Sequence, residues 1–175
     1  MSSAAEVGLE GVISEAITYY TDSHNATGNF DYVVANPPFN VDNVKKDLLA
    51  GGVGKPGTRF PWGVPTTDNA NYLWISLFAS ALKPGSRAGF VMANSASDAR
   101  GSEQAIRQRM IQEGLIEAMV SVGNNMFYTV TLPVTLWFLG TCRISAELRS
   151  WDSVFRCRPS PSNAASPPSS PPTTT

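Results

Sequence analysis

Residues 36 to 39, Asn-Pro-Pro-Phe, combine hydrogen-bond acceptors with a flat apolar ring. They directly follow residues 32 to 35, an apolar run with the size of a strand fully buried in a parallel sheet. Each proline fixes its φ angle near about −65° and lacks a backbone donor, which leaves carbonyl oxygens on a stiff loop. Asn36 adds an amide oxygen that can accept a hydrogen bond, and Phe39 adds a stacking surface. This combination predicts a site for a planar amine.

The chemistry that fits such a site is transfer of a group to the exocyclic amine of a nucleobase. This amine is a poor nucleophile because its lone pair is delocalised into the ring. The Asn36 side-chain oxygen and the Pro37 carbonyl would hold both amine hydrogens and direct the lone pair at an electrophile. The amine is inaccessible inside a duplex, so the base must be flipped out and stacked, which gives Phe39 a task. The alternative is that the four residues are only a turn that ends a strand.

The elements that must position this segment alternate as they do in an α/β sheet. Glycine and proline exclude regular structure from residues 51 to 68, which predicts a long loop. In a doubly wound sheet the ligand site lies beyond the carboxyl ends of the strands, where residues 36 to 39 fall. The predicted strands are residues 11 to 17, 31 to 35, 88 to 93, 115 to 122 and 132 to 139, and the predicted helices are 42 to 49, 69 to 82 and 102 to 113.

Length and composition exclude several classes of protein. The 175 residues, 42% of them hydrophobic, fit one domain, and the net charge of −1 provides no global basic field for nucleic acid. No run of about 18 uncharged apolar residues and no signal-peptide layout is present, which predicts a cytoplasmic protein without membrane contact. Two cysteines, Cys142 and Cys157, and a single histidine, His24, argue against a metal site.

A glycine pattern in the long loop imitates a nucleotide-binding motif. Residues 52 to 57 spell Gly-x-Gly-x-x-Gly, but they follow a short helical segment instead of a strand. They precede Arg-Phe-Pro-Trp at residues 59 to 62, which cannot open a helix. A phosphate loop is also excluded, because Pro56 follows Lys55 where serine or threonine is needed. A connecting loop near the site is the better interpretation.

The Asn-Pro-Pro-Phe segment resembles the catalytic motif of amino-group methyltransferases that use S-adenosylmethionine. Longer segments, residues 15 to 25, 30 to 44 and 68 to 139, resemble the modification (methylase) subunit of type I restriction-modification systems, an adenine-specific DNA methyltransferase. The short motif is shared with methylases of ribosomal RNA and of protein glutamine, so the longer segments specify the family. The resemblance implies a Rossmann-like methyltransferase fold, incomplete because the first strands and the glycine-rich cofactor motif are missing.

The resemblance also implies the roles of individual residues in the acceptor site. Asn36, Pro37, Pro38 and Phe39 would form the catalytic segment, in which Asn36 and Pro37 bind the target amine and Phe39 stacks on the adenine. A second aromatic motif, Asn-Asn-Met-Phe-Tyr-Thr at residues 124 to 129, would supply the other stacking face. That face would be Phe127 or Tyr128, with packing under a loop as the alternative.

Cofactor contacts are implied for two asparagines. Asn36 would lie against S-adenosylmethionine, and Asn71 and Tyr72 would open a helix beside the cofactor and the active site. The alternative for these last two residues is a helix cap and a core residue. The implied partners are DNA, a specificity subunit that reads its sequence, and a restriction subunit.

Residues 1 to 139 therefore predict a partial methyltransferase catalytic domain, residues 140 to 158 an irregular segment unlike the family, and residues 159 to 175 a disordered tail rich in Pro, Ser and Thr. The missing cofactor turn and the altered carboxyl end predict a fragment, from a truncated or frameshifted reading frame. The strand before Asn36 would then lie at an exposed sheet edge, which predicts poor solubility and weak cofactor binding.

The predicted function is methyl transfer from S-adenosylmethionine to the exocyclic amine of adenine in DNA, within a type I system. Two alternatives stay open. One is an amino-group methyltransferase that acts on RNA or protein, and the other is an inactive remnant that at most associates with partner subunits.

Overall fold

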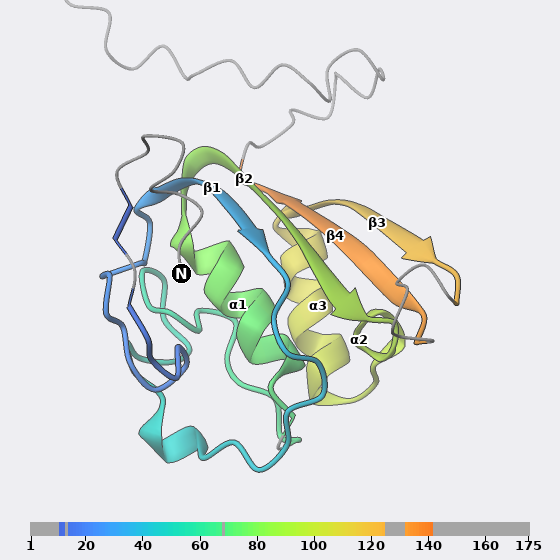
Figure 1. The fold of residues 1–175 in the computed structure, drawn as a ribbon, viewed down its shortest axis with the longest axis horizontal. Helices are drawn as coiled ribbons and strands as arrows, with labels where there is room; N and C mark the ends of the chain where they lie inside the picture. The colour runs from blue at the N-terminus through green and yellow to red at the C-terminus, as the bar shows by residue number, and fades with distance from the viewer. Residues whose placement is uncertain (1–10, 13, 68, 125–131, 142–175) are drawn as a thin grey trace, which may run out of the picture.

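The part of the chain that the structure describes forms one mixed four-stranded sheet with helices on one face. A computed structural model describes residues 11, 12, 14–67, 69–124 and 132–141. The strands lie in the order β1-β2-β4-β3 (Figure 1), with β1 parallel to β2 and with β4 antiparallel to both of its neighbours. Their bounds are Phe30–Ala35 for β1, Leu82–Ala93 for β2, Ile116–Val122 for β3 and Val134–Gly140 for β4. The predicted α/β class is confirmed.

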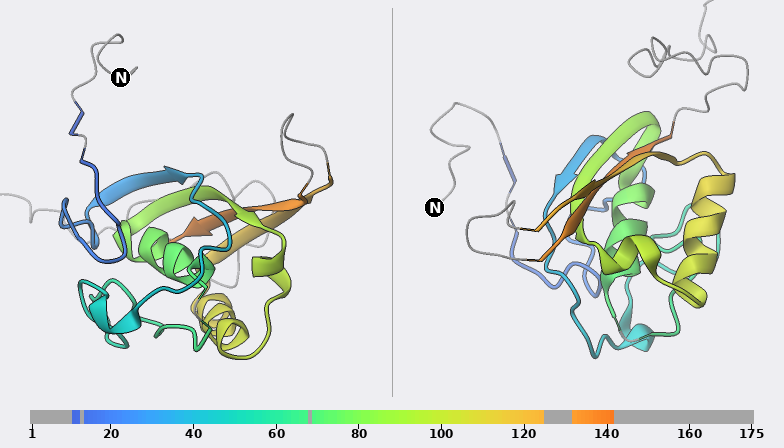
Figure 2. Two further views of the ribbon diagram at one scale, coloured as in Figure 1. Left: turned by 60° about the horizontal axis from the view of Figure 1, so that its bottom comes forward. Right: turned by 90° about the vertical axis from the view of Figure 1, so that its right-hand side faces the viewer.

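Two longer helices, α1 (Asn71–Ala81) and α3 (Ser102–Gln112), pack on the same face of the sheet (Figure 2). The other helical segments are a four-residue helix, α2 (Ser95–Asp98), and a 3-10 turn, η2 (Lys46–Leu48). The helix α3 ends in a Schellman motif, since Gly114 has φ +72° and the Leu115 N–H donates to the Met110 oxygen at 3.0 Å. None of the described helices is long and apolar enough to cross a bilayer.

Most of the predicted elements are present. The strands predicted at 31 to 35, 115 to 122 and 132 to 139 and the helices predicted at 69 to 82 and 102 to 113 each match an element to within two residues. The strand predicted at 88 to 93 begins earlier, at Leu82. Its pairing with β1 passes from Phe30–Leu82 to Tyr32–Arg87, so the Pro84-Gly85 turn bulges out of the sheet without ending the strand.

Two predicted elements are wrong. Residues 11 to 17, apart from the undescribed residue 13, form no strand, because no described strand pairs with them, and Val12 and Ile17 are exposed. The helix predicted at 42 to 49 shrinks to η2, because Asn43 takes a left-handed φ of 61° and Lys45 is extended. The long loop at 51 to 67 is confirmed, with a single bridge between Val53 and Phe60 and neither a strand before its glycines nor a helix directly after them.

The main core lies between the sheet and the two longer helices. Trp137 on β4 is fully buried, with its ring 6.2 Å from Phe90 of β2 and 6.4 Å from Tyr72 of α1. These contacts join the helix layer to the middle of the sheet. A second cluster, around Phe60 and Leu73, packs the long loop against the far side of α1. Both clusters therefore hold the start of α1 in place relative to the end of β1.

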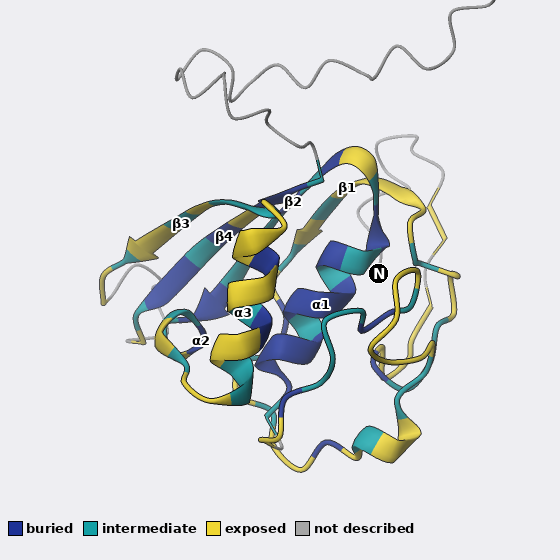
Figure 3. Cartoon of the chain, turned by 180° about the vertical axis from the view of Figure 1, so that it is seen from behind, coloured by how far each residue is buried: buried dark blue, intermediate teal, exposed yellow. Residues whose placement is uncertain are grey.

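The opposite face of the sheet and the outer edge of β1 are open. Tyr32 and Val34 on β1 are 77% and 89% exposed. Val34 is in register with Gly89 and Phe138 across the sheet, and Phe138 is also exposed. The expectation of a fully buried strand is therefore wrong, because β1 is at the edge of the described sheet and both described long helices cover the same face, the one toward the viewer in Figure 3. The expected exposure of an apolar edge is confirmed.

Candidate active site

The Asn-Pro-Pro-Phe segment leaves the sheet at the carboxyl end of β1. The carboxyl end of the parallel strand β2 lies beside it and continues into the polar residues Asn94 and Ser95. The predicted location, at the edge where ligands bind in α/β sheets, is thus the observed one. Residues 36 to 39 and residues 94 and 95 therefore lie at the same edge of the sheet.

The four residues of the segment differ in burial. Asn36 and Pro38 are exposed, Phe39 is half-buried and Pro37 is buried. Within the part of the chain that the structure describes, no group forms a hydrogen bond with the Asn36 side chain. The Asn36 amide is therefore available to an incoming donor, while the buried Pro37 anchors the backbone beside it.

Asn40, directly after the segment, connects three elements. Its N–H donates to Asn71 Oδ1 at 3.0 Å, and Asn71 Nδ2 donates back to Asn40 Oδ1 at 2.9 Å. Ser95 Oγ, after β2, donates to the same oxygen at 3.3 Å. Asn71, for which the resemblance implies a place near the cofactor, is buried at the start of α1 and bonded to this loop. The predicted cofactor role of Asn71 stays a prediction.

Tyr72 is a core residue whose hydroxyl holds the turn after β2. The hydroxyl donates to the Ala96 oxygen at 2.7 Å and accepts from Arg107 Nη1 at 2.7 Å. Arg107 also donates to the Ala99 oxygen at 3.1 Å. Side chains of both α1 and α3 therefore form hydrogen bonds with the backbone of α2 and the residue directly after it. Burial raises the pKa of Tyr72 above its usual value, although the hydrogen bond from Arg107 opposes this rise. The core alternative for Tyr72 is therefore the one observed.

The end of β2 is also tied to the start of β4. Thr135 Oγ1 donates to Asn94 Oδ1 at 2.8 Å, and the Asn94 N–H donates to the Pro133 oxygen at 3.2 Å. The β3–β4 connection therefore begins and ends at the same sheet edge as Asn94. Phe127 and Tyr128, predicted to cover the second face of the base, belong to this connection and lie outside the described residues.

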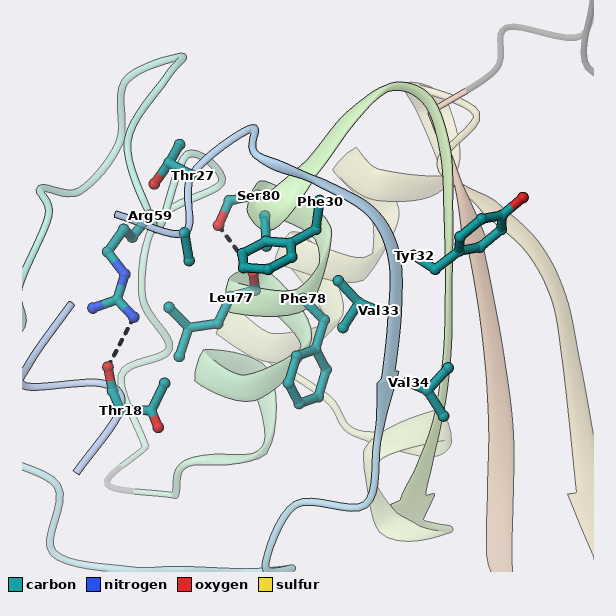
Figure 4. Close-up of a pocket in the computed structure, with 12 residues that line it drawn as sticks. Thr18, Thr27, Phe30, Tyr32, Val33, Val34, Arg59, Leu77, Phe78 and Ser80 are labelled. Atoms are coloured by element: carbon teal, nitrogen blue, oxygen red, sulfur yellow. Dashed lines mark hydrogen bonds between the residues drawn. The ribbon is translucent and has the colours of Figure 1, made fainter. Parts of the chain in front are cut away.

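A separate pocket of about 270 Å³ lies between β1 and α1, and its lining does not include residues 36 to 39 (Figure 4). Its apolar side is formed by Phe30 and Phe78, and Arg59 borders its polar side. Arg59 is only 2% exposed and donates to the Thr18 oxygen at 2.8 Å, with Asp22 3.7 Å away. Burial lowers the pKa of Arg59, and Asp22 opposes this effect. Arg59 thus fastens the long loop, and we assign it no part in the candidate site.

Sequence reasoning missed Asn40, Asn94 and Ser95. The signal for Asn94 and Ser95 was a polar pair directly after a buried strand, which is the same signal that singled out Asn36. Asn40 gave no comparable signal. Among the described residues, no group of three or more His, Cys, Asp or Glu side chains lies close enough to hold a metal ion.

Solved structures define the class of protein to which this fold belongs. The methyltransferase subunit of a type I restriction-modification system from Streptococcus thermophilus aligns over 81% of this chain and 30% of its own, with a TM-score of 0.69 and 21% identity. A chain from a study of complex assembly and conformational transition of the type I system aligns over 77% of this chain and 26% of its own, with a TM-score of 0.57 and 20% identity. The fold is that of Rossmann-like methyltransferases, as predicted.

Sequence comparisons make the assignment more specific. The family model of the N-6 DNA methylases matches residues 7–151. The MjaIX type I methylase subunit of Methanocaldococcus jannaschii is 40% identical over 137 residues, which is 75% of this chain and 24% of that protein. The HindI subunit of Haemophilus influenzae is 29% identical over 121 residues, which is 69% of this chain and 26% of that protein. The chain belongs to the N-6 DNA methylase family and spans about a quarter of the length of these relatives. The predicted resemblance to type I modification subunits is confirmed.

Proposed function

We propose that this chain supplies the acceptor side of a site-specific adenine DNA methyltransferase of a type I restriction-modification system. One observation carries the proposal. The Asn36 amide is exposed and has no hydrogen-bond partner among the described residues, and it lies beside a buried Pro37 and a half-buried Phe39 at the carboxyl end of β1. A turn that merely ended the strand would not need an acceptor and an aromatic face at the ligand edge of the sheet.

The chemistry follows from what these residues offer to an adenine amine. Asn36 Oδ1 and the Pro37 oxygen accept the two amine hydrogens, which draws the nitrogen lone pair out of conjugation and aims it away from the loop. S-adenosylmethionine, when bound, supplies an electrophilic methyl group. On accepting this methyl group, the amine held by Asn36 and Pro37 would lose one proton to solvent, and the cofactor would leave as the neutral thioether. Asn36 stabilises the positive charge that the nitrogen gains.

The described residues fit the acceptor amine better than they fit the methyl donor. No glycine-rich strand-to-helix turn occurs among them, since residues 52 to 57 lie in a loop. Asn36 and Asn71 are the residues that we propose near the cofactor. We assign them no more than proximity to it.

Stacking is the second part of the proposed acceptor site. Phe39 would stack on one face of the flipped adenine, and Phe127 or Tyr128 would cover the other. A base held between two aromatic faces recovers part of the energy lost on leaving the duplex. The β3–β4 connection starts from the same sheet edge as residues 36 to 39, which supports this arrangement.

The proposal also includes partners and a location. The net charge of −1 fits a DNA-reading surface that is carried by a separate specificity subunit. That subunit and a restriction subunit are implied by the resemblance to type I modification subunits. The names of the relatives, type I methylase subunits, support this assembly. A cytoplasmic location fits a protein that modifies DNA.

A labelling assay tests the proposal. The chain would be combined with the specificity subunit of its system, radiolabelled S-adenosylmethionine and DNA from a methylation-deficient strain. Asn36→Ala is expected to lower labelling about 100-fold or more, the usual cost of losing one charge-stabilising group. Asn29→Ala, at the other end of β1, is the matched control and should label normally.

Each outcome of this assay has a definite meaning. Equal labelling by the unsubstituted chain and Asn36→Ala would rule out the role of Asn36. Labelling of RNA or protein in place of DNA would show that the acceptor is not DNA, while the type of reaction, methyl transfer to an amino group, would stand. No labelling of any acceptor would leave the chain as an inactive remnant.

A further inference from the structure

The segment that carries Asn36 and Phe39 is fastened to α1 by two asparagines. The Asn40 N–H donates to Asn71 Oδ1, and Asn71 Nδ2 donates to Asn40 Oδ1. A backbone N–H can only donate, so Asn71 must turn its oxygen toward the Asn40 backbone and its amide nitrogen toward the Asn40 side chain. The two amides therefore form a reciprocal pair with a single arrangement of donors and acceptors.

The two members of the pair have different surroundings. Asn71 is 4% exposed, and its own backbone N–H donates to Asn69 Oδ1 at 2.8 Å. This bond restrains the backbone from which the Asn71 side chain extends. Asn40 has a left-handed φ of 52°, which costs energy for any residue with a side chain and is tolerated best by asparagine. The Ala70 N–H donates to the Val41 oxygen at 2.8 Å. Two successive loop residues are thus held by two successive residues at the start of α1.

We infer that Asn71 is a positioning residue that acts through Asn40 to fix the Asn-Pro-Pro-Phe segment at the ligand edge of the sheet. The inference rests on the proposed function for its catalytic consequence. Asn40 directly follows Phe39, so its backbone angles set the direction in which the aromatic ring and the preceding carbonyls face. A shift of about 1 Å in a reacting group can cost about 100-fold in rate. Ser95, which bonds to Asn40 Oδ1, adds support from the end of β2.

Hydrogen exchange at the Asn40 amide, followed by NMR on the purified chain, tests this anchor without any catalytic activity. Asn71→Leu keeps the side-chain volume and removes both bonds, so exchange at residue 40 should accelerate about 5- to 30-fold, as expected for one to two hydrogen bonds. Ser80→Ala is the matched control, because it removes a side-chain hydrogen bond to the Leu77 oxygen at the other end of α1 without touching Asn40 or Asn71. It should leave exchange at residue 40 unchanged.

Two substitutions of Asn40 separate the side chain from the backbone. Asn40→Gly keeps the left-handed φ and removes the amide, whereas Asn40→Asp keeps an acceptor for both Asn71 Nδ2 and Ser95 Oγ. In the labelling assay, Asn71→Leu and Asn40→Gly should lower kcat about tenfold or more with little change in KM for DNA. Asn40→Asp should restore most of kcat. A merely structural role would instead lower the melting temperature and change KM and kcat together.

The outcomes separate this inference from the proposed function. Unchanged exchange at residue 40 in Asn71→Leu overturns the inference, and so does faster exchange with an unchanged kcat. If the unsubstituted chain labels no acceptor, the proposed function fails. Hydrogen exchange at residue 40 then decides by itself whether Asn71 anchors the segment. Faster exchange in Asn71→Leu, together with retained protection in Asn40→Asp, would then still support the anchor, and unchanged exchange would still overturn it.

Discussion

Phe39 is half-buried, so the protein covers part of this residue and leaves part of it accessible. A ring held in this way offers a stacking surface at a low entropic cost, because the contact with the protein already restricts its rotation. The role of Phe39 is therefore separable from that of Asn36. In the proposed site, the ring would contribute affinity for the flipped base, and the amide would contribute to the chemical step.

Phe39→Ala is accordingly expected to lower kcat/KM for DNA about tenfold to 100-fold, which is the usual contribution of stacking on one base. Phe39→Trp should retain most of the value, because a larger flat ring replaces the lost one. Steady-state labelling kinetics with the specificity subunit measure both variants. Phe138→Ala, which removes an exposed phenylalanine from the open sheet face, is the control and should leave kcat/KM unchanged. A normal kcat/KM for Phe39→Ala would remove stacking from the proposal.

For individual residues, the part of the candidate site that could be predicted is the part that is contiguous in the sequence. Asn36 to Phe39 carry acceptors and a ring in four successive residues, so their chemistry can be recognised without a structure. Asn40 meets Asn71 and Ser95 across 31 and 55 residues of chain, respectively. No local pattern encodes such a contact, because it arises only when the sheet brings the ends of β1 and β2 together. The anchor of the segment was therefore invisible in the sequence.

In the helix α3, two opposing effects act on the carboxylate of Glu103, namely the helix dipole and burial. Glu103 lies in the first turn of α3, where the helix dipole favours a negative charge. Burial nevertheless raises the pKa of Glu103 above its usual value, and the Thr67 hydrogen bond and the Arg107 charge only partly oppose this rise. Desolvation therefore outweighs the favourable position at the helix end.

The direction of this shift predicts a pH-dependent effect of Glu103→Gln. With a folded-state pKa above the unfolded value, the folded chain binds more protons in the interval between the two. Stability from this group is then fully present below the unfolded pKa and is lost as the pH rises through the folded pKa. Glu103→Gln should therefore raise the urea midpoint at pH 7.5 and change it less at pH 4.5. Asp47→Asn, at an exposed position, controls for the change in net charge. A lower midpoint for Glu103→Gln at pH 7.5 would contradict the prediction.

The type of an element could be predicted where its hydrophobic pattern was long. The prediction failed where that pattern was short. The apolar spacing of α1 and the buried run of β2 extend over several residues and match their tertiary surroundings. Residues 42 to 49 offered one weak helical turn, and the left-handed Asn43 interrupts it. Residues 11 to 17 had a strand-like composition, but a strand requires a partner and none of the described strands supplies one.

For the whole molecule, the open edge and face of the sheet are the main risk to solubility. The outer backbone groups of β1, which pair with none of the described strands, lie next to exposed Tyr32 and Val34 and form a template for another strand. Phe138 continues the apolar surface across the sheet, where its ring lies 3.6 Å from the position that a Cβ on Gly89 would take. The exposed apolar surface therefore extends from the edge to the centre of the sheet.

Val34→Lys should reduce self-association of the purified chain several-fold, because a lysine on an edge strand opposes pairing with a second strand. Val34 is 89% exposed, so the substitution should leave the fold intact. Sedimentation velocity measures the monomer fraction. Ile111→Lys, at a 55% exposed apolar position on α3, is the matched control for added charge. Equal gains from both variants would show that charge, and not the edge, governs association.

The strand order has a consequence for synthesis of the chain. The last described strand, β4, lies between β2 and β3, so β3 reaches the rest of the sheet only through a strand that is translated after it. Until residues 134 to 140 are available, β3 has no hydrogen-bonding partner among the described strands, and β2 is paired on one side only. Completion of the sheet is thus timed by the arrival of its final strand.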